Sequence, residues 1–379
     1  MMKKSYMTAA IAMLLFGFQC SDIKPPAAKN VPPGSYLLIA NTDYATGELA
    51  VMDLSTNALT PVVTPVGSDL VVHVENGVPY VINRFGFDSV MKLDPKANFA
   101  TLYESSTGAS NNPQDIALTA SGDALVSLYG ANSLSLLNTA TGVVSAGPSL
   151  ASFMNPADPD GAPEASGMVA SGGQIYLALQ NFNQTTWSTV APGSLLKIDA
   201  TTLAVTALAP MPYHNPFSDL KIYNRVSDGA TLLYTAAVGS WGAADGGVVV
   251  YNLTSGAYET AIAETAITAP GTIAQGADVT DVLIVSDTLA FVIIQDANWA
   301  NSVLAFDPST WAQTQVLFDG SATFSYIPDM VYAAGKLYIA DRTFGAEGIR
   351  IFDTATLTEV TTAPIATGLP PASLAVIQF

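Results

Sequence analysis

Short runs of alternating apolar and polar residues follow one another along residues 35–379, with no convincing amphipathic helix among them. Seven of these runs end in Asp or Asn, and in six of them Thr or Ser follows three residues later. An Asx side chain can accept hydrogen bonds from backbone N–H groups two residues on, which favours a tight hairpin. We therefore interpret these residues as turn formers: Asp53, Asp94, Asn138, Asp199, Asn252, Asp307 and Asp353.

A β-rich run precedes each of these seven strands, and a further strand precedes that run. The preceding runs are Tyr36–Asn41, Pro79–Asn83, Ala124–Tyr129, Ile175–Leu179, Leu232–Ala236, Leu289–Ile294 and Leu337–Asp341. The repeating unit is thus four short antiparallel strands with a period near fifty residues. Radial repetition of such a unit is typical of a β-propeller, so the sequence predicts an all-β, seven-bladed propeller over residues 35–379.

The two ends of the repeat region complement each other. Nothing before Tyr36 can serve as the innermost strand of the first repeat, and Ser373–Ile377 has the pattern of an innermost strand with no blade after it. Pairing the two ends would close the ring and remove exposed sheet edges. We therefore expect residues 371–379 to complete blade one, and we expect a monomer.

Some of these strands resemble a known family. Tyr338-Ile339-Ala340-Asp341 and Leu38-Ile39-Ala40-Asn41 are similar to the YVTN repeat of bacterial surface propellers. The segment from Asp158 to Gln180 is similar to one in uncharacterised bacterial lipoprotein propellers. The resemblance implies the fold and export from the cytoplasm, and it makes lactone hydrolysis, which some YVTN-like propellers catalyse, a rival function. WD40 repeats are disfavoured because no tryptophan is followed by Asp.

The first nineteen residues have the features of a lipoprotein signal peptide. Lys3 and Lys4 precede an apolar stretch, Met7–Phe18, that is shorter than the roughly 20 residues of a membrane-spanning helix. Cys20, the chain's one cysteine, follows directly, and lipid attachment would explain a lone thiol in an exported protein. Phe18 and Gln19 are bulkier than usual at such a site, which leaves ordinary secretion as the alternative.

Residues 20–34 are rich in proline and predict a tether between the lipidated Cys20 and the propeller. Ser21 after the cysteine favours the outer membrane of the cell envelope, so the expected membrane contact is the lipid anchor alone. The formal net charge of −18 argues against nucleic acid as a partner and favours metal ions or cationic groups.

Five of the predicted innermost strands open with Asp, and these strands would surround the channel. The residues are Asp69, Asp115, Asp219, Asp281 and Asp329. In a propeller they would share one face with the loops between second and third strands. Each could simply cap a local turn, or together they could form an acidic ring at the channel mouth that holds a cation.

The predicted loops of that same face combine amide, carboxylate, arginine and aromatic groups, which suits a glycan, a peptide or an envelope protein as ligand. The candidate binding residues are Arg84, Phe85, Phe182, Trp241, Trp299, Arg342 and Phe344. Arg84 and Arg342 occupy equivalent positions in the blades that flank blade one. They could alternatively neutralise nearby carboxylates.

A long insertion between blades contains Asp158, Asp160 and Glu164 around Gly161. Hard oxygen ligands around a flexible glycine are what a calcium loop requires, so calcium is the one cofactor that the sequence suggests. The segment lacks the helices and the distant Glu of an EF-hand, and a plain solvated turn is the alternative.

The sequence gives little support for a catalytic function. His73 and His214 have no Ser or Cys nucleophile motif near them, and no zinc-protease, Walker, Rossmann or hydrolase-elbow motif is present. We therefore expect a non-catalytic binding or scaffolding module that uses its loop face, with a lactonase-like hydrolase as the alternative. A convergent cluster of His, Glu or Arg on that face would favour the hydrolase.

Overall fold

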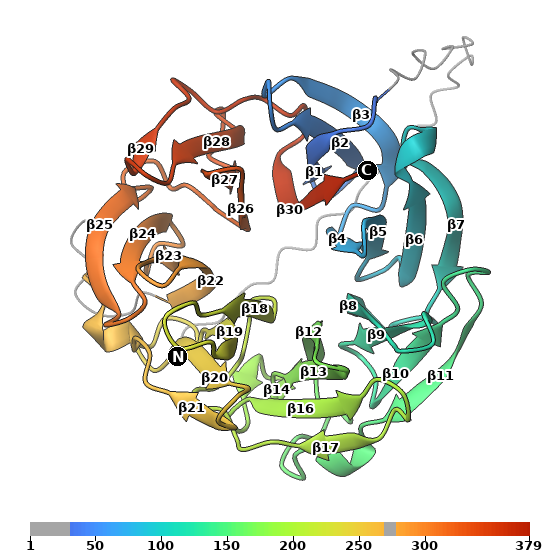
Figure 1. Ribbon diagram of the computed structural model, residues 1–379. Helices are drawn as coiled ribbons and strands as arrows, with labels where there is room; N and C mark the ends of the chain where they lie inside the picture. Colours follow the sequence, from blue (N-terminus) through green and yellow to red (C-terminus); the bar gives the residue numbers. More distant parts are fainter. Residues whose placement is uncertain (1–30, 269–277) are drawn as a thin grey trace, which may run out of the picture.

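The computed structural model describes residues 31–268 and 278–379. Seven four-stranded antiparallel sheets stand around a central channel like the blades of a propeller (Figure 1). This confirms the predicted fold class and the number of blades. The predicted signal peptide and Cys20, the predicted lipidation site, lie outside the described residues.

Within each blade the strands follow one another from the channel outwards. Blade one contains, in that order, β30 (Pro371–Gln378), β1 (Ser35–Thr42), β2 (Gly47–Asp53) and β3 (Leu59–Val66). Blade two contains β4 (Leu70–Glu75), β5 (Val78–Asn83), β6 (Ser89–Asp94) and β7 (Ala100–Ser106). Blade three contains β8 (Pro113–Leu118), β9 (Ala124–Leu128), β10 (Ser133–Leu137) and β11 (Val144–Ser149).

Blade four contains β12 (Ala165–Ser171), β13 (Gln174–Leu179), β16 (Ser194–Asp199) and β17 (Val205–Ala207), with an added hairpin of β14 (Phe182–Asn183) and β15 (Ser188–Thr189). Blade five contains β18 (Lys221–Asn224), β19 (Thr231–Ala237), β20 (Gly247–Asn252) and β21 (Ala257–Glu259). Blade six contains β22 (Asp278–Ser286), β23 (Leu289–Gln295), β24 (Asn301–Asp307) and β25 (Ala312–Phe318). Blade seven contains β26 (Met330–Ala333), β27 (Lys336–Asp341), β28 (Gly348–Asp353) and β29 (Thr358–Glu359).

Helical structure in the described chain is limited to short 3₁₀ turns. They are η1 (Pro95–Ala97), η2 (Ala151–Phe153) and η3 (Glu264–Ala266). The second of these lies in the predicted insertion, which runs between β11 and β12. No described helix is long and apolar enough to cross a membrane.

The Asx residues of the repeat form the predicted turns between third and fourth strands. In blade one, Oδ1 of Asp53 accepts from the backbone N–H groups of Ser55 at 2.8 Å and Thr56 at 3.0 Å. Corresponding bonds to a backbone N–H occur in the other six blades. These turns lie on the face opposite to the loops between second and third strands, which we call the loop face.

The C-terminal strand closes the ring as predicted. β30 pairs antiparallel with β1 from Ser35 opposite Gln378 to Asn41 opposite Pro371. Leu374 of this strand packs into the apolar cluster between blades seven and one, and Ile377 packs into the cluster between blades one and two. The last strand therefore joins both neighbours of blade one.

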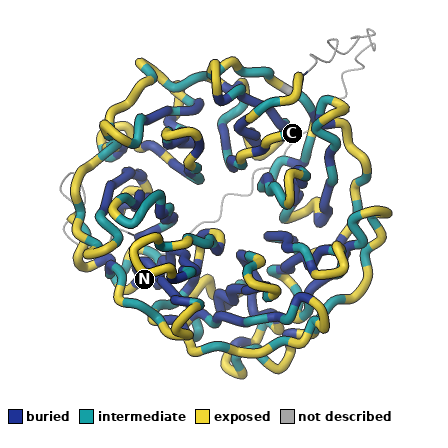
Figure 2. Tube along the Cα trace, viewed as in Figure 1, coloured by how far each residue is buried: buried dark blue, intermediate teal, exposed yellow. Residues whose placement is uncertain are grey.

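The core is divided among the spaces between blades. Apolar side chains of the inner strands fill seven clusters, and Figure 2 shows burial concentrated there while the turns and the outer rim are exposed. The packed chain also reaches into the predicted tether. Val31 is 5% exposed within the core cluster of blades one and two, and its N–H donates to Oδ1 of Asn98 at 2.8 Å. Residues 31–34 thus belong with the propeller, and the predicted boundary at residue 35 was too late.

Candidate functional site

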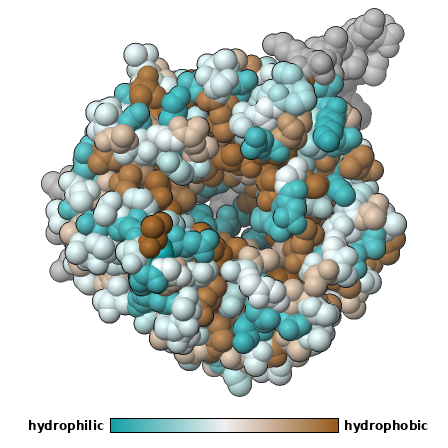
Figure 3. All heavy atoms as spheres, viewed as in Figure 1, coloured by the Kyte–Doolittle hydropathy of each residue, from teal (hydrophilic) through white to brown (hydrophobic). Residues whose placement is uncertain are grey.

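The channel opens on the loop face into a cavity of about 360 Å³. All seven blades contribute residues to its wall, from Ser373 in blade one to Asp329 in blade seven. Figure 3 shows one face of the ring, hollowed at its centre where the channel opens. A cavity built from every blade is the site in this fold at which side chains far apart in sequence converge.

Strand register defines which residues form the ring at this mouth. One position on each innermost strand is equivalent in all blades. In six blades the residue after it pairs with the same place on the second strand. In blade five the same place follows by extending the register of β18 and β19 by one residue from Lys221 opposite Tyr234. The occupants of this ring position, in blade order, are Ser373, Val71, Asp115, Gly167, Asp219, Asp281 and Asp329. Four of the five predicted aspartates are therefore ring members. In blade two, Val71 occupies the ring position, and Asp69 lies two residues before it, nearer the loop face.

Gly167 occupies the ring position of blade four for a steric reason. A Cβ atom at this residue would lie 2.8 Å from the backbone nitrogen of Leu220 in blade five. Because backbone cannot give way as a side-chain end can, the close approach of these two blades requires glycine. This explains why the acidic series is interrupted in blade four.

Ring side chains also connect neighbouring blades. Oδ2 of Asp115 accepts from the N–H of Met168 at 2.6 Å, and Oδ2 of Asp329 accepts from Leu374 at 2.7 Å. Oγ of Ser373 accepts from Val72 in the same way at 3.2 Å. These carboxylates thus satisfy the next blade's backbone, and the local turn-capping alternative describes only part of their role.

Two cationic side chains lie further into the channel than the ring, each two residues along its strand from a ring position. His73 follows Val71 by two residues and Lys221 follows Asp219 by two residues, so the alternation of a strand turns both towards the channel. Nδ1 of His73 lies 3.0 Å from Oδ1 of Asp115 in the next blade, and Nε2 lies 3.2 Å from Oε2 of Glu75. Lys221 forms an ion pair with Asp281 of the next blade, and its Nζ donates to the carbonyl of Val282 at 3.1 Å.

The protonation states follow from this arrangement. Burial alone would lower the pKa of His73, but attraction to Asp115 and hydrogen bonds to Asp115 and Glu75 outweigh it and raise the pKa to about 10. Burial likewise opposes the charge of Lys221, while Asp281 and Asp219 raise its pKa above the usual value. Burial, followed by the like charges of Asp281 and Asp219, raises the pKa of Asp329 to about 8.

Two ring carboxyl groups remain without a cation of their own. In the described residues, neither Asp219 nor Asp329 takes part in a salt bridge. Asp219 is exposed to the cavity, and Asp329 is held mostly as the neutral acid at neutral pH. The mouth therefore combines an accessible carboxylate, a carboxylic acid and an ammonium group.

The loop tips of blades two and seven differ in what their arginines contact. Arg84 lines the cavity and forms a salt bridge with Asp69 at 2.7 Å, which is the neutralising role considered from the sequence. Arg342 instead donates to the carbonyl of Thr42 at 3.0 Å and to the carbonyls of Pro370 and Pro371 at the start of β30, and it lies over the ring of Tyr44. Arg342 thus attaches blade seven to blade one, and within residues 31–268 and 278–379 it forms no salt bridge with a carboxylate.

The aromatic candidates are distributed unevenly over the loop face. Phe182 is 4% exposed, so its prediction as an accessible binding residue was wrong; it packs edge-on against Trp187, which lines the cavity. Trp241 lies 5.1 Å from Phe217 of the cavity wall and 6.0 Å from Trp299, measured between ring centroids. Phe85 and Phe344 are exposed at their loop tips and do not line the cavity.

Sequence reasoning missed the cationic pair. His73 and Lys221 carried a usable signal, since each stands two residues after a ring position and a strand's alternation places both on the channel side. His214, the other histidine of the chain, does not line the cavity; it lies in the connection between blades four and five, opposite Pro192.

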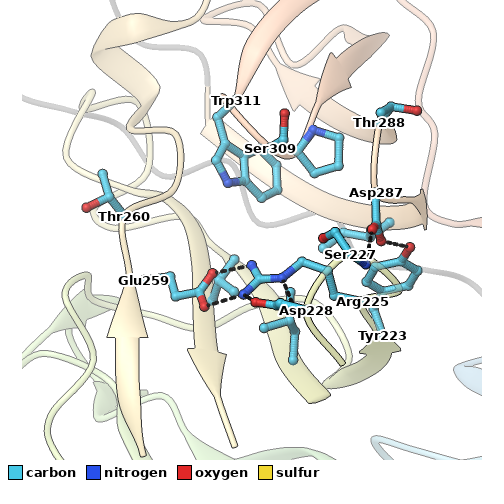
Figure 4. Close-up of a pocket in the computed structure, with 14 residues that line it drawn as sticks. Tyr223, Arg225, Ser227, Asp228, Glu259, Thr260, Asp287, Thr288, Ser309 and Trp311 are labelled. Atoms are coloured by element: carbon cyan, nitrogen blue, oxygen red, sulfur yellow. Dashed lines mark hydrogen bonds and ion pairs between the residues drawn. The ribbon is translucent and has the colours of Figure 1, made fainter. Parts of the chain in front are cut away.

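A second cavity of about 390 Å³ lies on the opposite face between blades five and six (Figure 4). Its polar wall is a closed network: Arg225 binds Glu259 at 2.7 Å and Asp228 at 2.6 Å. The hydroxyl of Tyr223 donates to Asp287, and Trp311 faces this network across the cavity. Because these charged groups already pair with one another, fewer of them are free to contact a ligand than at the loop-face mouth.

The comparisons with known proteins support the fold. No protein-family model matches the chain, and no curated protein matches it. Among solved structures, the chain is similar to the periplasmic gluconolactonase PpgL of Pseudomonas aeruginosa, with a TM-score of 0.62 and 11% identity over 91% of this chain and 99% of that one. It is similar to a putative 6-phosphogluconolactonase of Bacteroides fragilis, with a TM-score of 0.61 and 13% identity over 94% and 100%. It is also similar to AztD of Citrobacter koseri, with a TM-score of 0.54 and 12% identity over 92% and 99%. At these identities the likeness shows a shared fold.

Proposed function

We propose that this protein is a hydrolase of neutral lactones that acts at the loop-face mouth of its channel. The observation that carries the proposal is the convergence of Asp219, Lys221 and Asp329 on one cavity formed by all seven blades. Lactone hydrolysis was the alternative function considered from the sequence, and the structural likeness to gluconolactonases supports it over a purely scaffolding role.

The three side chains match the needs of lactone hydrolysis. The carboxylate of Asp219 takes a proton from water as the water oxygen bonds to the lactone carbonyl carbon. The ammonium of Lys221 stabilises the charge that develops on the carbonyl oxygen. The carboxylic acid of Asp329 then protonates the ring oxygen as its bond to that carbon breaks, which yields the open-chain hydroxy acid. Proton exchange with solvent restores both aspartates.

The charge of the mouth selects against anionic substrates. Along its wall the carboxylates of Asp69, Asp219 and Asp281 outnumber the cations Arg84 and Lys221. A phosphorylated sugar lactone would be repelled, whereas an uncharged one would not. The same field would favour release of the product, because hydrolysis creates a carboxylate.

A location in the cell envelope fits this proposal. The features of residues 1–19 and of Cys20 support export and lipid attachment, and one structurally similar gluconolactonase is periplasmic. We propose that the propeller is anchored to the outer membrane by Cys20, with residues 21–30 as the tether.

The test is hydrolysis of δ-gluconolactone by the full mature chain, followed as acid release in a pH-stat above the spontaneous rate. We expect Asp329→Asn and Asp219→Asn each to lower kcat by about 100-fold or more, the usual contribution of a positioned acid or base. Asp319→Asn is the matched control, since Asp319 is exposed and outside the cavity. A rate equal to the spontaneous one, or equal rates in all variants, would contradict the proposal.

A binding module without chemistry is the second candidate. The aromatic group of Phe217, Trp241 and Trp299 beside the mouth favours it, because exposed rings stack on sugar faces. For such a module, calorimetry would detect an intact sugar ligand without turnover, and Trp241→Ala would lose the binding while Asp329→Asn would keep it.

A further inference from the structure

Three carboxylates converge in the insertion between β11 and β12. Asp158, Asp160 and Glu164 each place one carboxylate oxygen within 4.8 Å of the other two. Asp158 is 7% exposed and Glu164 is fully buried. Carboxylates this close repel one another, and burial strengthens the repulsion because water no longer screens it.

The three carboxylates of this cluster lack some of the hydrogen-bond donors and all of the cations that would stabilise them within the described residues. Oδ2 of Asp158 is buried and has no hydrogen-bond partner in the described part of the chain, where Oδ1 receives only a long bond of 3.4 Å from the N–H of Asp160. Among the described residues no Lys, Arg or His forms an ion pair with any of the three carboxylates. A buried, unpartnered carboxylate oxygen is costly unless a cation balances it.

A second buried acidic group in the same molecule does not show this deficit. Glu264 and Asp278, between blades five and six, form another buried acidic group. There, both oxygens of Glu264 accept from backbone N–H groups, of Gly246 and Val279, at 2.7 Å, and Asp278 accepts from Gly242 at 3.0 Å. That group is satisfied by the protein itself, whereas Asp158 is not.

We propose that Asp158, Asp160 and Glu164 bind a divalent cation, and that this cation is calcium. Calcium takes several carboxylate oxygens and completes its shell with carbonyl groups or water. The cation would supply the positive charge and the partner that Oδ2 of Asp158 lacks.

The site also touches the mouth of the channel through the β14–β15 hairpin. Oε2 of Glu164 accepts from the N–H of Phe182 at 2.8 Å, and Oδ2 of Asp160 accepts from the N–H of Gln184 at 2.7 Å. The same hairpin carries Trp187, which lines the cavity. Orienting the two carboxylates would therefore fix the position of Trp187, so calcium would set the shape of the cavity wall at blade four.

The test uses the full mature chain, stripped of metal with chelator and titrated with calcium chloride by calorimetry and thermal melting. We expect one calcium per chain and a rise in Tm of several degrees at about a hundredfold excess over Kd. We expect Asp158→Asn combined with Asp160→Asn to lose both effects, and Asp278→Asn, the matched control, to retain them. Circular dichroism would establish that each variant is folded, and Asp160→Asn alone gives a milder variant with weaker binding.

Two results would overturn the proposal. One is the absence of heat and of a Tm shift in the wild-type chain; the other is an equal shift in the double variant, which would place the cation elsewhere. The coupling to the mouth has its own readout, since calcium should change tryptophan fluorescence in the wild type but not in Trp187→Phe. An unchanged spectrum in the wild type, despite binding, would refute that coupling.

Discussion

Aspartate residues of this protein behave in opposite ways according to their place on a strand. Asp53 closes a turn in solvent, where hydrogen bonds from Ser55 lower the pKa of its carboxyl group. Asp329 stands at the ring position, where burial and two neighbouring carboxylates raise the pKa to about 8. The same side chain is therefore a structural anion at one end of the blade and a neutral acid at the other.

The first prediction concerns Asp329→Asn. The folded state holds the Asp329 proton more tightly than the unfolded chain, whose carboxyl titrates near 3.8. The stability that this proton contributes is fully present below about pH 4 and is lost as pH rises through about 8. Asn cannot titrate, yet its oxygen can still accept from Leu374. We therefore expect the variant to be more stable than the wild type at pH 9 by a few kcal/mol, since each unit of pKa difference corresponds to about 1.4 kcal/mol, and nearly equal at pH 4.

Urea unfolding at pH 4, 7 and 9 measures this difference. The exposed Asp319→Asn is again the control and should follow the wild-type pH profile. A constant difference between Asp329→Asn and the wild type at all three pH values would show that Asp329 does not titrate in this range.

At the scale of elements, β30 contacts three blades, which the local sequence of this strand does not indicate. It hydrogen-bonds to β1, its Leu374 packs towards blade seven, and its Ile377 packs towards blade two. Without it, blade one would lose its innermost strand and blades seven and two would each lose an apolar partner. Since hydrogen bonds and apolar packing, and no covalent bond, join blade one to its last strand, β30 holds the ring together.

We expect a chain that ends at Pro370 to show no cooperative melting transition. A synthetic peptide of residues 371–379 should restore it in trans, because a sheet edge can bind an added strand through backbone hydrogen bonds. Differential scanning calorimetry with and without the peptide is the measurement. A peptide with Leu374→Asp and Ile377→Asp is the control and should not rescue. A truncated chain that melts like the full chain would disprove closure by β30.

The whole molecule carries far more acid than base, with 31 Asp and Glu against 13 Lys and Arg. His73, Lys221 and Arg84 form ion pairs around the channel, which partly neutralises the carboxylates there. The outer surface has few cations left to balance its acids. Net self-repulsion of this kind opposes the compact state and is weakened by salt.

We therefore expect Tm to rise by a few degrees when sodium chloride increases from about 10 mM to about 500 mM, over which range the screening length falls from about 30 Å to a few ångströms. The melts are run with chelator present so that divalent cations do not contribute. Choline chloride should act like sodium chloride if the effect is general screening. A Tm that falls with salt would mean that surface attraction outweighs repulsion.

Local patterns were enough to predict the blades. Period-two strands and an Asx turn after each third strand are short-range features, and together with the complementary chain ends they predicted seven blades closed by residues 371–379. Among the predicted mouth residues, Asp69, Asp219, Asp281, Asp329 and Arg84 also line the loop-face cavity. A strand's alternation relates a residue's number to its direction, which is why the innermost-strand positions could be predicted.

Only the tertiary structure decided which of these side chains act together. The pairing of His73 with Asp115 and of Lys221 with Asp281 joins neighbouring blades, and no sequence spacing specifies how two blades pack. The offset of Asp69 from the ring, the burial of Phe182 and the unpartnered oxygen of Asp158 depend in the same way on register and on what covers a residue. Periodicity is a property of one strand and can be read along the chain, whereas register, burial and charge pairing arise between strands and exist only once the ring is assembled.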